Sequence, residues 1–266
     1  MVLFCVGNYV IMEYQYKDMV SMKENQTPEL ANSLLLDFYW QWSHRIDESL
    51  FGVEFSNPYY IKTPSDWWEK KHRIMIVGEE GAGTWGAGKR EFSSGDENWN
   101  PRTELGINKI MDYNGSETHD QTAERNSCRK GLFWSRIRKI YDLDKNISIV
   151  WNNIDKIHRL GNSGKECRLT PKQRTLLHQA KVLGTEIEIL KPTIIVFFGW
   201  HWLSLEKEIP EDIYTDVYRR YTGHESEPIL LNNMVFSLHP NDRTYGGCTK
   251  VYEEKVLGRV RSLLNH

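Results

Sequence analysis

The chain has 266 residues, of which 39% are hydrophobic and 26% charged, with a formal net charge of −2. This length fits one large domain with a sizeable core, and the balanced charge excludes a globally basic nucleic-acid-binding protein, although a local basic patch stays possible. Its 4 cysteines stand far apart without a C-x-x-C pair, so we predict free thiols, no metal and no cofactor.

The opening stretch, MVLFCVGNYVIM, is apolar but does not have the features of a targeting or membrane segment. It lacks a basic start and a small-residue cleavage site, and it is too short to cross a bilayer. Free cysteines are typical of a reducing compartment. We therefore expect a cytoplasmic protein with no membrane partner.

The predicted elements alternate between helices and short apolar strands. Thr27 and Pro28 are typical of a helix start, and the run that follows them, to residue 50, has apolar residues at helical spacing. The apolar run at 73–78 ends in Gly78 and predicts a buried strand. Further along we predict a loop at 91–101, a helix at 131–143, a strand at 147–151, a long helix at 170–192 opened by Thr170 and Pro171, strands at 193–199 and 234–238, and a closing helix at 250–264.

Strands that alternate with long helices predict a mostly parallel central sheet covered on both faces, and therefore an α/β fold, a three-layer α/β/α sandwich. We expect a single domain over residues 1–266, with 1–70 as a helical extension packed on it. In such sheets ligands bind beyond the carboxyl ends of the strands. Four stretches follow predicted strands and carry polar or aromatic residues there: GEEGAG, WNNIDK, GWHW and LHPND.

The glycine-rich stretch after the first strand has the spacing of two phosphate-binding motifs without their context. The G-x-x-x-x-G-K run at 83–89 begins well beyond the strand and is followed by Arg90 instead of the Ser or Thr that holds magnesium. The G-x-G-x-x-G run at 81–86 opens no evident helix, and no acid ends a second strand about twenty residues later. The remaining interpretation is that Glu79 or Glu80 is the functional group and that the glycines keep the chain thin around a ligand.

Taken in order, GEEGAG, WNNIDK, IIVFFG and SLHPND resemble the motifs of the uracil-DNA glycosylase superfamily, over residues 73 to about 247. Members of this family pair a first motif of the type Gly-x-acid-Pro-Gly or Gly-Glu-x-Pro-Gly with a later motif similar to His-Pro-Ser. The resemblance implies an enzyme that rotates a nucleotide out of the duplex and hydrolyses its N-glycosidic bond. Nothing indicates a lysine nucleophile, so a monofunctional glycosylase is expected instead of a lyase.

The resemblance also implies roles for the residues that match its motifs. Glu80, the favoured acid, fits the acid position of the Gly-x-acid form of the first motif, and Glu79 fits that of the Gly-Glu-x form. One of them would stabilise the sugar cation, and the second would cap a turn. His239 would donate a hydrogen bond to the departing base. Asn153 or Asn152 would read the base through its amide, unless the pair only forms a turn. Further base contacts are expected from Gly81, Ala82, Gly83 and Trp85, and DNA contacts from Arg243, Tyr245, Arg136, Lys139 and Lys156.

The basic run at 125–139, which includes Arg136 and Lys139, has two interpretations of equal standing. It is either a stripe that faces DNA phosphates or a solvated helix face. The expected partner under the first interpretation is DNA that contains a modified or damaged base, bound by a monomer.

Departures from the family pattern point to the target base. Gly81 replaces the proline of the first motif, and the cysteine spacing does not match the branches that hold an iron–sulfur cluster. Ala82 and Gly83 stand where the uracil-specific branch has a tyrosine that walls off C5 of the pyrimidine. A bulky C5 substituent would therefore fit, with hydrogen bonds from the loop at 85–102. The favoured target is a C5-modified pyrimidine such as glucosylated 5-hydroxymethylcytosine of phage DNA, in antiviral defence. The alternatives are a uracil-DNA glycosylase of base-excision repair, a non-catalytic DNA-binding member, and a nucleotide-binding α/β enzyme.

Overall fold

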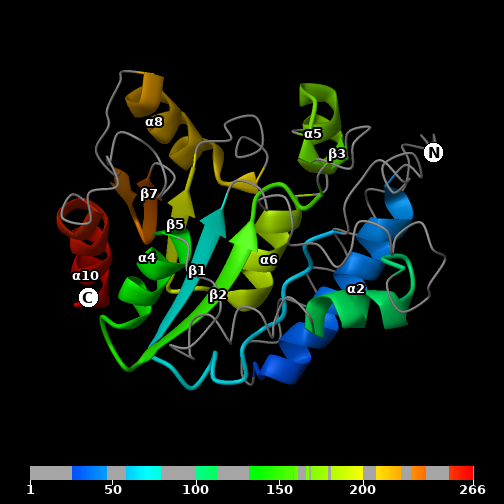
Figure 1. The fold of residues 1–266 in the computed structure, drawn as a ribbon, viewed down its shortest axis with the longest axis horizontal. Helices are drawn as coiled ribbons and strands as arrows, with labels where there is room; N and C mark the ends of the chain where they lie inside the picture. Colours follow the sequence, from blue (N-terminus) through cyan, green and yellow to red (C-terminus); the bar gives the residue numbers. More distant parts are fainter. Residues whose placement is uncertain are drawn as a thin grey trace, which may run out of the picture.

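The structure is a computed structural model of the whole chain. It describes residues 26–46, 58–78, 100–112, 132–157, 159–160, 166–167, 169–178, 181–199, 208–222, 229–237 and 252–265. These residues form an α/β fold around a five-stranded sheet with the strand order β2-β1-β5-β7-β6 (Figure 1). Four neighbouring strands are parallel, and β6 pairs antiparallel at the edge. The strands are β1 (His72–Gly78), β2 (Ile147–Asn153), β5 (Ile194–Phe198), β6 (Ile229–Leu231) and β7 (Met234–Ser237).

Helices surround this sheet, and a short two-stranded ribbon lies apart from it. Figure 1 shows α5 and the ribbon beyond the upper end of β2, where the strand arrows end. The helices are α2 (Pro28–Arg45), one at 104–112, α4 (Leu132–Tyr141), α5 (Pro171–His178), α6 (Val182–Leu190), α8 (Glu211–Thr222), a π-helical segment η3 (Glu253–Leu257) and α10 (Gly258–Leu264). The ribbon consists of β3 (Arg159–Leu160) and β4 (Glu166–Cys167).

The two predicted helix starts are confirmed by their caps. The Thr27 hydroxyl accepts a hydrogen bond from Leu30 N at 3.3 Å, with Pro28 in the first turn of α2. At α5, the Thr170 hydroxyl accepts from Gln173 N at 3.3 Å, and Thr170 N donates to the Gln173 amide oxygen at 2.9 Å. This reciprocal pairing is a capping box, which satisfies two backbone donors at once.

The predicted long helix at 170–192 is wrong, because the chain forms two helices there. Lys181, the residue before α6, has a left-handed backbone with φ 50°, which a continuous right-handed helix cannot contain. The second predicted strand is too short: β2 extends to Asn153, so both asparagines belong to the strand. The helix at 104–112, α8 and β6 were not predicted, and the closing helix at 250–264 divides into η3 and α10.

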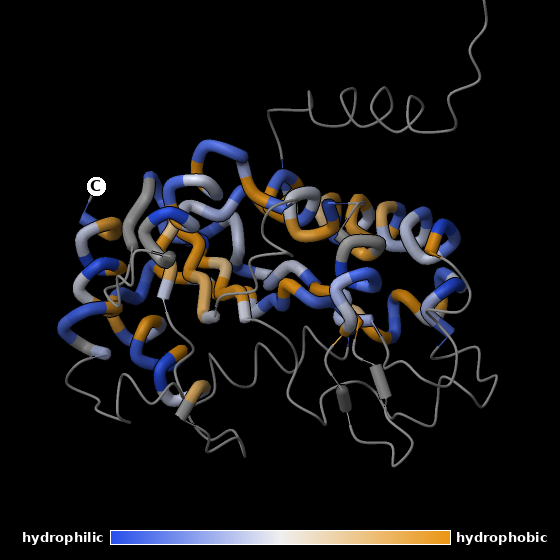
Figure 2. Tube along the Cα trace, turned by 90° about the horizontal axis from the view of Figure 1, so that it is seen from above, coloured by the Kyte–Doolittle hydropathy of each residue, from blue (hydrophilic) through white to orange (hydrophobic). Residues whose placement is uncertain are grey.

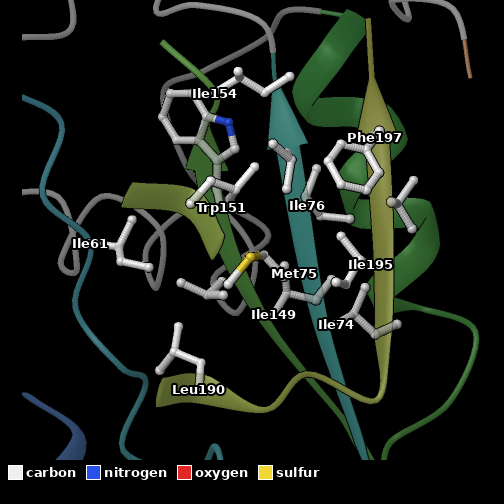
Figure 3. Close-up of a cluster of buried hydrophobic side chains, with 14 of the residues drawn as sticks. Ile61, Ile74, Met75, Ile76, Ile149, Trp151, Ile154, Leu190, Ile195 and Phe197 are labelled. Carbon is white, nitrogen blue, oxygen red and sulfur yellow. The ribbon is translucent and has the colours of Figure 1, made fainter. Parts of the chain in front are cut away.

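The strands are apolar along most of their length because helices cover both faces of the sheet. Side chains of successive residues point to opposite faces, so Trp151 and Phe198 share one face and Met75 and Asn152 the other. Trp151 packs on aromatic rings of α4, whereas Asn152 contacts Glu186 of α6. The strands form a hydrophobic centre between more hydrophilic helical segments (Figure 2), and Figure 3 shows its side chains.

Candidate functional site

The carboxyl ends of the four parallel strands lie in register at one edge of the sheet. Asn153 pairs with Gly78, Gly78 with Phe198, and Phe198 with Ser237, so these residues form one row on one face. The backbone pairing between β1 and β2 continues past the strands, because Ile154 N donates to Gly78 O at 2.9 Å. Two of the four stretches singled out in the sequence begin directly after this row, GWHW after Phe198 and LHPND after Ser237, and GEEGAG begins in the row with Gly78 itself.

The predicted acid and imidazole belong to the chain directly after this row. Glu79 follows Gly78 at the end of β1, and His239 stands two residues after Ser237 at the end of β7. One strand, β5, separates β1 from β7, so the two strand ends lie about 10 Å apart. The side chains of Glu79, Glu80 and His239 themselves lie outside the described residues.

The two asparagines at the end of β2 point to opposite faces of the sheet. Asn152 makes a full set of contacts: its amide nitrogen donates to Glu186 Oε2 at 2.8 Å, and its amide oxygen accepts from Lys156 Nζ. The same oxygen also accepts from Asn153 N at 2.8 Å. Both polar atoms of the Asn152 amide are therefore already hydrogen-bonded within the fold, and the amide is not available to a ligand.

Glu186 is the centre of a buried polar cluster that joins α2, α6 and β2. Its Oε2 lies 2.7 Å from Lys156 Nζ, and its Oε1 accepts from the Tyr39 hydroxyl. Ile61 N in turn donates to that hydroxyl at 3.2 Å. The side chains of Glu186 and Lys156 are 0% and 2% exposed, so each charge depends on the other for its compensation.

The pKa values in this cluster reflect the competition between burial and pairing. Burial raises the pKa of Glu186, and Lys156 and the donors around it oppose that rise. Burial lowers the pKa of Lys156, against the pull of Glu186. The pKa of Tyr39 is raised well above its usual value by burial and by the neighbouring carboxylate, so Tyr39 stays a hydrogen-bond donor. We assign the cluster a framework role.

Asn153 has the opposite character on the other face of the sheet. It is 1% exposed, yet neither its amide oxygen nor its amide nitrogen has a hydrogen-bond partner among the described residues. A Cβ placed on Gly78 would lie only 2.8 Å from that amide oxygen, so the glycine makes the room that the amide occupies. Buried amides without partners are rare and costly, which makes this side chain the strongest candidate for a ligand contact.

A second unpaired donor lies beside this amide. The indole Nε1 of Trp151 also has no partner in the described part of the chain, and it would lie 3.5 Å from the same Gly78 Cβ position. Trp151 precedes Asn153 by two residues and shares its face of β2. Figure 3 shows its indole nitrogen on the side of β1. Trp151 was predicted only as a strand residue, although the period of two along a strand places it on the same face as Asn153.

An aromatic group holds the Trp151 ring in place. The ring centroid lies 4.6 Å from that of Trp134 and 6.0 Å from that of Phe133, both on α4. Tyr59 packs on it with a centroid distance of 4.8 Å. Phe133 also contacts Phe198 of the strand-end row at 5.9 Å. The unpaired amide and indole therefore stand at the edge of a rigid, largely apolar wall.

Two of the residues predicted to bind DNA are buried. Arg136 is 2% exposed and lies over the Tyr252 ring, with its Cζ 4.7 Å from the ring centroid. Lys156 belongs to the Glu186 cluster. The structure thus gives both residues packing or framework contacts, and this position of Arg136 does not fit a solvent-facing phosphate stripe. Lys139 is partly exposed on α4.

The other predicted contacts, Gly81, Ala82, Gly83, Trp85, Arg243 and Tyr245, lie outside the described residues. Among the residues that are described, no cluster of three or more His, Cys, Asp or Glu side chains is arranged to hold a metal ion. Within the same part of the chain, no helix combines the length and apolar character needed to cross a membrane.

Comparison with known proteins adds no relative. No family model matches the chain, and no curated protein matches it. The functional assignment therefore depends on the motif order and on the geometry of the strand ends.

Proposed function

We propose that this protein is a monofunctional DNA glycosylase, with the three-layer sandwich of the uracil-DNA glycosylase superfamily. The observation that carries the proposal is the Asn153 amide, buried and without a partner at the carboxyl end of β2. An amide that offers one acceptor and two donors matches the hydrogen-bonding edge of a nucleobase. The alternation of the strand favours Asn153 over Asn152 as the base-reading residue, because Asn152 is already fully bonded.

The proposed reaction needs one group near the sugar, supplied after β1, and one group near the base, supplied after β7. A water oxygen bonds to C1′ of the sugar as the C1′–N bond breaks, and the bonding electrons leave with the base. The proton that the water loses is taken up by the departing base, so the products are the sugar hydroxyl and the neutral base. A carboxylate from Glu79 or Glu80 would stabilise the sugar cation, and His239 would stabilise the negative charge on the base. A separation of about 10 Å between the β1 and β7 ends leaves room for a nucleotide between the two groups.

The proposed target is a pyrimidine with a large C5 substituent, glucosylated 5-hydroxymethylcytosine in particular. Support comes from Ala82 and Gly83, two small residues at the position where uracil-specific relatives carry a tyrosine wall. The target distinguishes this enzyme from a repair enzyme for uracil, because a wall at C5 excludes the larger base.

Mass spectrometry of released bases tests the proposal. The protein is incubated with phage DNA that contains glucosylated 5-hydroxymethylcytosine, with uracil-containing DNA and with unmodified DNA. Release of the modified base, lost in the Glu79→Ala/Glu80→Ala double variant, is the expected result. If the protein releases only uracil, it is a DNA glycosylase whose target is uracil and not the modified base. If the wild-type protein releases no base from any of these DNAs, the glycosylase proposal is wrong.

A further inference from the structure

The Trp151 indole raises a question that the proposed function does not answer. A fully buried aromatic ring is an ordinary core feature, but an indole N–H in the core usually donates to a carbonyl. Trp67 shows the usual arrangement here, since its Nε1 donates to Leu190 O at 2.8 Å. Trp151 is 4% exposed, and its Nε1 has no such partner among the described residues. A ligand with an acceptor at this position would satisfy the indole N–H.

The position of the indole N–H limits what that acceptor is. Trp151 and Asn153 lie on the same face of β2, and Gly78 of β1 lies opposite them. The indole nitrogen and the Asn153 amide oxygen both lie within 3.5 Å of the point that a Gly78 Cβ would occupy. The two groups therefore border the same position at the end of β1, close enough together for the hydrogen-bonding edge of one nucleobase.

We propose that the Trp151 indole N–H is a second base-reading group, which donates a hydrogen bond to the 2-carbonyl oxygen of an extruded pyrimidine while Asn153 pairs with the far end of its edge. This inference rests on the proposed function and extends it from one reading residue to two. Trp151 would thereby act as a specificity-determining residue that selects pyrimidines over purines.

The selection follows from the pattern of donors and acceptors on each base. An indole only donates, so the base must present an acceptor beside the group that Asn153 reads. Cytosine and uracil both carry O2 next to N3 and satisfy this condition, whatever stands at C5. Adenine presents a C–H at the equivalent place, and guanine presents an amino group whose hydrogens would face the indole N–H. A C5 substituent lies at the other side of the ring and does not disturb this contact.

The aromatic neighbours of Trp151 make the contact specific. Tyr59 and Trp134 fix the plane of the ring, with centroids at 4.8 and 4.6 Å. A fixed ring holds its N–H in one direction without an entropic cost at the moment of binding. The substitution Trp151→Phe removes the N–H and keeps an aromatic ring in the group. Trp134→Phe is the matched control, because it changes the same aromatic group on the α4 side.

Indole nitrogen NMR of the full-length protein tests the proposal. The protein is labelled uniformly with ¹⁵N, so that the indoles of its 10 tryptophans and the side-chain amides of its asparagines are both observed. The Trp151 and Asn153 signals are identified by their absence from the spectra of Trp151→Phe and Asn153→Ala. Free cytosine, uracil and adenine serve as probes at millimolar concentration. We expect cytosine and uracil to shift the Trp151 signal saturably and adenine to leave it in place. If Asn153 amide signals respond to pyrimidines and the Trp151 signal does not, the proposed role of Trp151 is wrong and Asn153 reads the base alone.

Base release separates this inference from the proposed function. In an active enzyme, Trp151→Phe should lower kcat/KM for the modified base about ten-fold, the loss expected for one hydrogen bond, and Trp134→Phe should lower it less. Equal activity of wild type and Trp151→Phe would overturn the inference and leave the glycosylase assignment standing. If the wild type releases no base but the Trp151 signal still shifts with pyrimidines, the site stands and the enzymatic function is wrong.

Discussion

At the scale of single residues, two adjacent asparagines of β2 have different tasks because a strand turns successive side chains to opposite faces. Asn152 faces α6 and satisfies Glu186, Lys156 and the backbone of its neighbour. Asn153 faces α4 and has no partner among the described residues. A sequence of two asparagines cannot by itself indicate which of them is structural. The face of the sheet to which each side chain points decides it.

This difference predicts opposite consequences for two alanine variants. Asn152→Ala should lower the free energy of unfolding by about 2–3 kcal/mol, because it removes buried hydrogen bonds to charged groups. Asn153→Ala should leave that free energy within about 1 kcal/mol of the wild type, since no hydrogen bond among the described residues is lost, and it should abolish base release. Urea unfolding and the release assay measure the two effects. A strongly destabilised Asn153→Ala protein would contradict the assignment.

At the scale of elements, Gly78 couples β1 to the side chain of β2. A Cβ at this position would lie 2.8 Å from the Asn153 amide oxygen, which is closer than a Cβ comes to a neighbouring atom in folded proteins. Because that oxygen ends a short side chain, Gly78→Ala should displace the amide with a loss of only about 1 kcal/mol in stability. Base release should fall sharply. The matched control is Gly258→Ala at the start of α10, where a Cβ meets nothing within 4 Å, and it should leave activity unchanged.

The ion pair between Lys156 and Glu186 connects the segment directly after β2 to α6, and Tyr39 of α2 also contacts Glu186. Lys156→Met leaves the Glu186 carboxylate buried without its cation and should cost about 3–5 kcal/mol in urea unfolding. Changing Glu186 to Gln in the same chain removes the unpaired charge, so the double variant should be more stable than Lys156→Met alone. If the double variant loses as much free energy of unfolding as the Lys156→Met and Glu186→Gln single variants lose together, the two side chains are not coupled.

Elements with local signals were predicted, and those that depend on distant contacts were not. Apolar runs located β1, β5 and β7, and Thr-Pro pairs located the starts of α2 and α5. The break before α6 has no such signal, because Lys181 is an ordinary helix former that takes a left-handed backbone. The Glu186 cluster was also missed. Tyr39 and Glu186 are 147 residues apart, and no local sequence pattern in either segment predicts their contact.

At the scale of the whole molecule, the order of the strands brings together what the sequence separates. The stretches after β1, β2 and β7 are far apart in the chain, yet the order β2-β1-β5-β7 places their beginnings along one edge. The sequence motifs predicted this convergence only through the rule for parallel sheets. The register supplies the rest, since it places Asn153 opposite Gly78 and not beside Met75.

A residue at the amino-terminal end of the parallel strands makes a pH-dependent contribution to stability. His72, at the start of β1, is 5% exposed, and its pKa is lowered because burial disfavours the imidazolium, with a further contribution from Lys71 and a smaller opposing one from Asp144. A histidine whose pKa is lower in the folded state stabilises the fold fully above the unfolded pKa of about 6.5, and that stability is lost as the pH falls towards the folded pKa.

The urea midpoint of the wild type should therefore fall between pH 7.5 and pH 5.5 by more than that of His72→Gln, which cannot titrate there. The difference between the two proteins cancels the carboxylates that they share. Since His72 lies at the start of β1 and the candidate site at its end, base release by His72→Gln should equal that of the wild type at pH 7.5. Parallel midpoint curves for the two proteins would mean that the His72 imidazole carries the same pKa in the folded and unfolded chain.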